Sequence, residues 1–198
     1  MPRLWNETIE AHRRDVHSAI LATTARLVAE RGVLSVTMSQ IAEDTGIGRA
    51  TLYKYFPDVD AILVAWHESQ IAAHLDQLTR ARDRGDGPAD RLRSVLEAYA
   101  AIQHGRRDVD SGALAEHLHG GEHAARVQQR LRALIRDVVS DAAAAGDVRR
   151  DVRADELAAY CMHALGAAVH LPTRAAVRRL VGVTATGLAG PRGSSPTA

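Results

Sequence analysis

The chain has 198 residues, of which 46% are hydrophobic and only 4% aromatic, so it can form one sizeable core or a small domain beside a larger one. The abundance of alanine and the scarcity of aromatic residues favour close-packed helices over a β-sandwich. The formal net charge of +1 excludes a broadly basic nucleic-acid binder, and residues 1–60 carry seven Lys or Arg residues against eight Asp or Glu residues. Any contact with DNA must therefore depend on the local placement of charge.

A single cysteine, Cys161, excludes an internal disulfide and is typical of a reducing compartment. The first residues have no apolar signal core, and no run approaches the roughly 18–20 apolar residues of a membrane span. We therefore expect a cytoplasmic protein without a membrane segment.

The apolar pattern predicts a first helix from about Thr8 to Arg31, ended by Gly32. Two short helices follow, folded at a glycine turn, and Asp58 can cap a long helix that reaches roughly Arg84. The remaining predicted helices cover about residues 88–104, 111–119, 123–145, 155–171 and 173–188. This pattern predicts an all-α chain with a first helical domain over residues 1–57, a second helical domain over 58–189 and a disordered tail over 190–198.

The stretch from Thr37 to Phe56 is the most informative part of the sequence. Thr37 or Ser39 can cap the first short helix, and Gly46 supplies the left-handed residue at which that helix ends. Ile47, Leu52 and Phe56 continue an apolar stripe that faces inward. The outer face is left to Arg49, Ala50, Thr51, Tyr53 and Lys54.

These outer residues suit the major groove of DNA. Arg49 can pair with guanine or hold a phosphate, and Thr51 can donate to a phosphate or touch a thymine methyl. Tyr53 and Lys54, the only lysine of the chain, are typical of contacts to the DNA backbone. A helix–glycine–helix corner in an ordinary all-α protein is the alternative, and the ordered combination of residues argues against it.

The run from Ile41 to Pro57, with Tyr53-Lys54-Tyr55-Phe56 near its end, resembles the DNA-binding domain of TetR-family transcriptional regulators. The resemblance is strong from about Val16 to Leu63 and only architectural beyond. It implies an N-terminal three-helix helix–turn–helix domain that a long helix joins to a C-terminal ligand-binding and dimerisation domain. It also implies a homodimer, usually a repressor, that binds a near-palindromic operator and responds to a small-molecule effector. By position, the residues that would contact DNA are Thr37, Arg49, Ala50, Thr51, Tyr53 and Lys54.

One position departs from the family pattern. Members commonly carry a lysine three residues after the phenylalanine, and this chain has Val59 there. A phosphate contact at the start of the fourth helix is therefore missing, or is left to the helix dipole alone.

The last two predicted helices are rich in alanine and glycine, whose small side chains let helix axes approach closely, as in a four-helix interface between two subunits. We expect that interface to use Leu157, Cys161, Ala164, Leu165, Ala168, Val177, Leu180, Val181 and Thr184. An intrachain helical hairpin is the alternative.

The resemblance places an effector pocket among the fourth to eighth helices. Candidate lining residues, each with a polar tip on a largely apolar helix, are Tyr99, Gln103, His117, Tyr160 and His163. The alanine content leaves room for a cavity of several hundred Å³, enough for a small apolar or amphipathic molecule.

His117, His119 and His123 form the densest histidine cluster and, with Glu122, suggest a metal-dependent hydrolase as a second function. Glycines break the helix between these ligands, so a solvated loop without metal is the preferred interpretation. A DNA-binding protein without a ligand is a third. We expect no cofactor, no enzymatic activity, and a packing role for Cys161.

Overall fold

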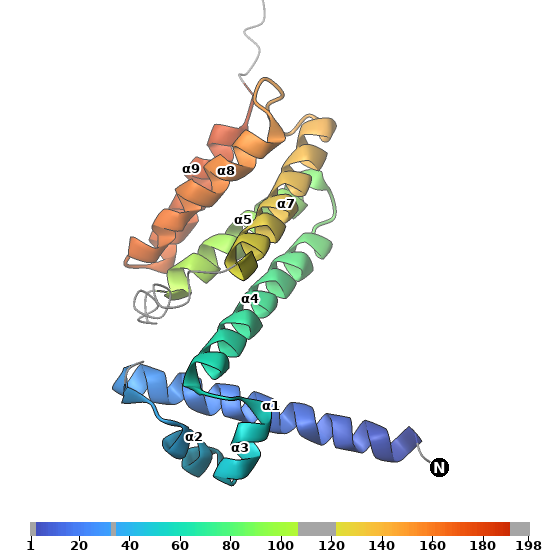
Figure 1. The fold of residues 1–198 in the computed structure, drawn as a ribbon. Coiled ribbons are helices and arrows are strands. Elements are labelled where there is room, and N and C mark those ends of the chain that lie inside the picture. Colours follow the sequence, from blue (N-terminus) through green and yellow to red (C-terminus); the bar gives the residue numbers. More distant parts are fainter. Residues whose placement is uncertain (1–2, 33–34, 107–121, 191–198) are drawn as a thin grey trace, which may run out of the picture. The chain divides into compact units, whose positions relative to one another are not determined.

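The computed structural model describes residues 3–32, 35–106 and 122–190, with side chains for 9–32, 35–106 and 128–190. Every regular element in these ranges is a helix, which confirms the all-α prediction (Figure 1). The chain divides into two compact units, whose described residues meet between Ala72 and Ala73. No helix in the described ranges is both long and apolar enough to span a membrane.

The first unit contains α1 (Arg3–Arg31), α2 (Met38–Thr45), α3 (Arg49–Tyr55) and the first turns of α4 (Val59–Asp83). Its core is apolar and fully enclosed, and its most buried side chains are Ile20, Leu27, Ile41, Leu52 and Ile62. The α1 helix begins about five residues earlier than predicted. The apolar pattern starts only at Val16, because none of the described side chains before it, residues 9–15, belongs to the core of the unit.

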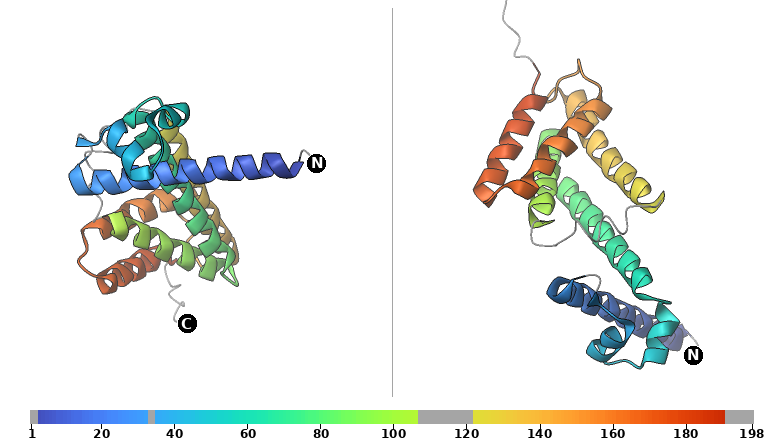
Figure 2. Two further views of the ribbon diagram at one scale, coloured as in Figure 1. Left: turned by 90° about the horizontal axis from the view of Figure 1, so that it is seen from below. Right: turned by 60° about the vertical axis from the view of Figure 1, so that its left-hand side comes forward.

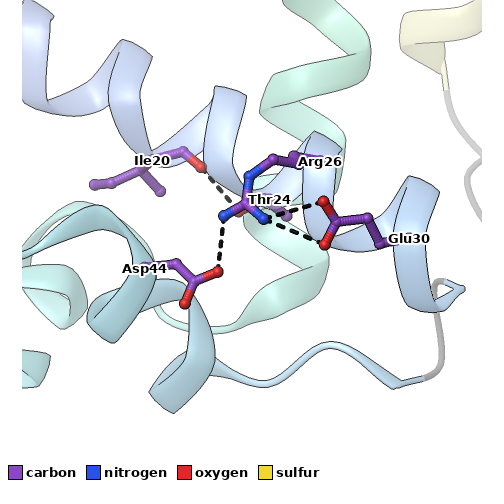
Figure 3. Close-up of polar contacts among 5 residues, drawn as sticks. All are labelled: Ile20, Thr24, Arg26, Glu30 and Asp44. Atoms are coloured by element: carbon purple, nitrogen blue, oxygen red, sulfur yellow. Dashed lines mark hydrogen bonds and ion pairs between the residues drawn. The ribbon is translucent and has the colours of Figure 1, made fainter.

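An ion-pair cluster joins the end of α1 to the end of α2 (Figure 3). Arg26 donates from Nη2 to Asp44 at 2.7 Å and from Nη1 to both carboxylate oxygens of Glu30 at 3.2 Å. The hydrogen bond to Asp44 is the largest of the effects that raise the pKa of Arg26. One turn earlier, the buried Thr24 hydroxyl donates to the Ile20 carbonyl at 2.9 Å. Exposed ion pairs stabilise little, so this cluster mainly fixes where α2 ends relative to α1.

The turn after α2 depends on Gly46, which has φ 74° and ψ 25°. Its N–H bonds to the Glu43 carbonyl at 3.0 Å, and the Ile47 N–H bonds to the Ala42 carbonyl at 3.0 Å. These bonds satisfy carbonyls that the helix end leaves open. A side chain at this φ would crowd the backbone, which is the role that the sequence predicts for Gly46.

The second unit contains the rest of α4, then α5 (Pro88–Gly105), α7 (Glu122–Ala145), α8 (Ala154–Gly166), the 3₁₀ helix η3 (Ala167–His170) and α9 (Arg174–Leu188). The α5 helix is central, because it contacts α7, α8, η3 and α9 (Figure 2). Fully buried side chains from four helices fill the core, among them Leu96, Ile135, Leu165 and Leu188.

Most helix ends in this unit follow the sequence signals. Pro88 opens α5, Gly146 with φ 92° follows α7, and the Thr173 hydroxyl caps α9 by accepting the Ala176 N–H at 3.2 Å. The predicted single helix over 155–171 is instead α8 followed by η3. Leu171 precedes Pro172 and is extended, with φ −82° and ψ 136°, because a residue before proline avoids the helical region. The predicted helix over 111–119 and the tail from 191 lie outside the described residues.

The α4 helix contributes to both units. Ala61, Ile62 and Ala65 pack on the first core, whereas Leu78 belongs to the second. The boundary between the units therefore falls inside α4, after Ala72, whereas the sequence analysis placed it between residues 57 and 58. Farther along α4, His74 is half-buried in the second unit. Burial and then the positive charge of Arg106 lower its pKa below the ordinary value of 6.5.

We expect Gly46→Ala to destabilise the first unit by about 1–2 kcal/mol, because alanine is strained at positive φ. Trp66 packs on the core of this unit, so tryptophan fluorescence during guanidinium unfolding measures its stability. Gly48→Ser is the matched control. Gly48 precedes α3 with φ −67°, where serine is a favoured N-cap, and we expect no loss. Equal losses in both variants would contradict this role for Gly46.

Because the pKa of His74 is lowered, we expect the free energy of unfolding to fall in mild acid. The folded state binds a proton on His74 less readily than the unfolded chain does, so stability is lost as pH falls below about 6.5. Between pH 7 and pH 5, the thermal unfolding midpoint of His74→Gln should fall less than that of the wild type, as measured by circular dichroism. His170→Gln, at an exposed site, serves as control. An identical loss in the wild type and both variants would show that His74 is not responsible.

Candidate nucleic-acid interface and ligand cavity

Thr37 begins the helix–turn–helix as the N-cap of α2. Its hydroxyl accepts the Gln40 N–H at 3.4 Å, while the Gln40 side-chain oxygen accepts from the Thr37 N–H and hydroxyl, both at 3.0 Å. This reciprocal cap settles the choice between Thr37 and Ser39 that the sequence left open. Thr37 is exposed, but its hydroxyl proton is already committed to Gln40.

The α3 helix is held by one face only. Leu52 is fully buried, and Phe56 is 6% exposed, with its ring centroid 5.0 Å from that of His17 on α1. The opposite face and the amino end expose every residue that the sequence assigned to DNA on this helix, namely Arg49, Ala50, Thr51, Tyr53 and Lys54. The predicted division between the two faces of α3 is therefore confirmed.

The charges on this surface are available to a partner. In the parts of the chain that the structure describes, neither Arg49 nor Lys54 forms a salt bridge. Arg26, by contrast, is neutralised by Asp44 and Glu30 and points its guanidinium at them (Figure 3). Arg13 and Arg14 on α1 are also exposed.

The start of α4 is acidic. The Asp58 carboxylate accepts the Ala61 N–H at 2.8 Å, so it occupies the place where a helix amino end could receive a phosphate. Val59 is half-buried and packs on the core of the first unit. The position that commonly carries a lysine in the family is thus taken by a residue that packs on the core, and a carboxylate caps the same helix end.

A cavity of about 520 Å³ lies between α5, α7 and α8 in the second unit. The described residues that line it are Tyr99, Gln103, Gln128, Gln129, Arg132, Ala159, Met162, His163 and Gly166. Three of the five predicted ligand residues, Tyr99, Gln103 and His163, are among them. The polar residues contributed by α7 were missed, because in sequence they read as the solvent face of an amphipathic helix.

Side chains of α5 form a hydrogen-bonded row along this cavity. Arg106 donates to the Gln103 side-chain oxygen at 3.3 Å, and the Gln103 amide donates to the Tyr99 hydroxyl at 2.7 Å. Burial raises the pKa of Tyr99, although the Gln103 bond and the charge of Arg106 act the other way. A second cavity of about 260 Å³ shares Gln103 and Gly166 and reaches Arg106 and Val169.

Two predicted ligand residues lie elsewhere. Tyr160 is 42% exposed and does not line the cavity. Its hydroxyl lies over α9, where a Cβ on Gly187 would come within 2.6 Å of it. His117 lies outside the described residues, as do His119 and the side chain of His123, so the structure does not describe the histidine cluster.

The residues expected at a dimer interface lie mainly inside the chain. Seven of the nine are buried in the core of the second unit: Leu157, Cys161, Leu165, Ala168, Val177, Val181 and Thr184. Ala164 and Leu180 are half-buried. The apolar stripe of each helix faces its neighbours in the same chain, because a helix buries its most apolar side where the core is densest. These side chains therefore make the intrachain hairpin that the sequence analysis weighed as the alternative.

Cys161 packs as predicted. Its side chain is fully buried, and burial raises the pKa of the thiol to about 12. A reactive thiol needs a lowered pKa and access to solvent, and Cys161 has neither. Among the described residues, no group of three His, Cys, Asp or Glu side chains is placed to hold a metal ion.

The known proteins that this chain resembles include bacterial transcriptional regulators. The sequence model for "Bacterial regulatory proteins, tetR family" matches residues 20–66, which cover most of the helix–turn–helix unit. The transcriptional regulator HbdR of Aromatoleum sp. (strain CIB) is 27% identical over 89 residues, 45% of this chain and 39% of HbdR. The match thus spans less than half of that relative's length.

Solved structures extend the likeness to nearly the whole fold. A TetR/AcrR-family regulator from Thermobifida fusca has a TM-score of 0.74 at 17% identity, covering 87% of this chain and 98% of the other. AibR, solved with isovaleryl coenzyme A and operator DNA, has a TM-score of 0.63 at 20% identity, covering 89% and 99%. With the exposed face of α3, the match over residues 20–66 supports a TetR-family transcriptional regulator, and the solved structures show the shared two-unit helical fold.

Proposed function

We propose that the protein is a homodimeric repressor that binds a near-palindromic operator through α3 of each protomer and releases it when a small molecule binds. The observation that carries this proposal is the exposed row on α3, which presents a guanidinium, two hydroxyls and an ammonium opposite a buried apolar face. A recognition helix of this kind docks in the major groove with its first residues at the base edges.

The residues of α3 take separate roles in this proposal. Arg49, at the amino end, reads a base or holds a phosphate, and Ala50 and Thr51 lie beside it. Tyr53 and Lys54 contact the DNA backbone and set the register of the helix. Since Asp58 and Val59 offer no cation at the start of α4, Lys54 carries a large share of the phosphate contact.

A second protomer supplies the rest of the affinity. One recognition helix reads few bases, and a dimer places two of them about 34 Å apart, one turn of DNA. The outward face of α8 and α9 is the surface that we assign to the partner. It carries Val183 of α9, 67% exposed and one turn before Gly187, and Tyr160 of α8, whose hydroxyl lies over Gly187. Small residues such as Ala164 and Ala167 flank them and allow helices to approach closely.

The cavity between α5, α7 and α8 is the proposed effector site. A ligand there contacts Gln103, which is bonded to Arg106, and the charge of Arg106 acts on His74 of α4. The α4 helix also contributes Ile62 to the core of the DNA-binding unit. An effector releases DNA only to the extent that it binds one conformer more tightly than the other.

Replacing the backbone-contacting residues should weaken DNA binding without regard to sequence. The operator is first recovered from genomic fragments by the purified protein. We expect Tyr53→Ala and Lys54→Ala to lose affinity several-fold both for this operator and for a random duplex. For Lys54→Ala, the slope of log affinity against log salt should fall by roughly one unit for each half-site. Arg49→Ala should also lose about 1–3 kcal/mol of preference at the base pair that Arg49 reads.

Gel-shift titrations at several salt concentrations measure all three variants. Arg93→Ala, on the exposed side of α5, removes a charge without touching α3 and should bind like the wild type. Unchanged affinity in all three α3 variants would remove the basis of the proposal.

The dimer surface can be tested by placing a charge on it. Val183→Glu should convert a dimer into a monomer with the 21.3 kDa mass of one chain, because a carboxylate would be buried there unpaired. Val64→Glu, at another exposed valine on α4, should leave the dimer intact. Sedimentation velocity measures both variants, and a dimer that persists in Val183→Glu places the interface elsewhere.

A further inference from the structure

The described lining of the cavity has one sign of charge. Arg132 of α7 supplies a cation, and no described lining residue is Asp or Glu. Its guanidinium donates a hydrogen bond to a neutral group, the Asp155 carbonyl, at 3.4 Å. A guanidinium has five N–H donors, so most of them remain for a ligand. Arg136, one turn farther along α7, is instead paired with Asp137 and lies outside the lining.

The neighbouring polar groups are mainly oriented as donors. The Tyr99 hydroxyl accepts a bond from Gln103, which leaves its own proton to donate, and no described residue accepts that proton. Gln103 cannot turn its oxygen toward Tyr99 without losing the bond from Arg106. Tyr99 is 6% exposed, and its hydroxyl is protonated at neutral pH because the ordinary tyrosine pKa lies near 10 and burial raises it further. Gln128, Gln129 and His163 add further polar groups.

The third wall is apolar. Ala159, Met162 and Gly166 of α8 line it, and Met adapts its shape to an alkyl chain. The volume of about 520 Å³ suits a small molecule and no macromolecular segment.

We propose that this cavity binds a small amphipathic carboxylate, with the carboxylate on Arg132 and Tyr99 and the apolar chain along Ala159, Met162 and Gly166. The proposal rests on the proposed function in taking this cavity as the effector site. Arg132 is exposed, and its guanidinium matches a carboxylate bidentately, whereas it would repel a cationic ligand and gain no ion pair from a neutral one.

Straight-chain probes of about six to ten carbons test the ligand class by isothermal titration at fixed ionic strength. Octanoate should bind at least tenfold more tightly than octan-1-ol, and octylamine should not bind. Within the carboxylate series, affinity should rise by up to about fourfold for each methylene until the apolar wall is covered.

Variants test the assigned residues. Arg132→Met should weaken octanoate binding by about tenfold or more while leaving octan-1-ol unchanged, since it removes a charged partner and keeps the bulk. Arg136→Met is the matched control. Arg136 lies one turn farther along α7, is exposed and paired with Asp137, and does not line the cavity, so binding should not change. Tyr99→Phe should weaken octanoate selectively and to a smaller degree. Circular dichroism confirms that each variant is folded.

Three results would overturn the proposal: no saturable octanoate binding at millimolar concentration, equal binding of octan-1-ol, or undiminished binding in Arg132→Met. The same titrations contain no DNA, so they are independent of operator recognition. A gel shift with and without octanoate then tests the proposed release. DNA binding that octanoate does not alter would count against the release mechanism and leave the ligand class intact.

Discussion

The burial of Leu52 and Phe56 against the other helices of the first unit is the interaction on which the exposed row of α3 depends. Each side chain contributes on the order of 2 kcal/mol by leaving water, and together they fix the rotation of α3 about its own axis. A helix of only seven residues, Arg49–Tyr55, is too short to be stable alone. Its exposed row therefore exists as a defined surface only because the opposite face is anchored.

The turn that leads into α3 adds a second constraint. The reciprocal cap of Thr37 with Gln40 starts α2, and the left-handed Gly46 ends it, so α2 has a fixed length of Met38–Thr45. The pair between Arg26 and Asp44 then holds that end against α1. The direction in which the chain enters α3 thus follows from local bonds, whereas its rotation follows from the core.

The second unit is organised differently, around one central helix. Here α5 is surrounded by α7, α8 and α9, which bury the most apolar stripe of each helix. The cavity forms where polar side chains of α7 and α5 meet small residues of α8. It lies at the edge of the apolar core, since Tyr99 belongs to both, and it therefore combines a guanidinium and amides with a short apolar wall.

Sequence alone identified the all-α fold, the two faces of α3, the left-handed role of Gly46 and the packed state of Cys161. Each of these depends on local propensity or on a period of 3.6 residues, which neighbouring positions encode. It also predicted Tyr99, Gln103 and His163 as cavity-lining residues, because a polar tip on an apolar helix marks a position between core and solvent. Tertiary structure decided the rest. Arg132, on a helix face that reads as solvent, lines the cavity because α8 lies across from it, and Leu157 and Val181 lie inside rather than outside because helices of the same chain cover them. A sequence pattern shows that a face is apolar or polar, but only the packing of distant segments determines what that face meets.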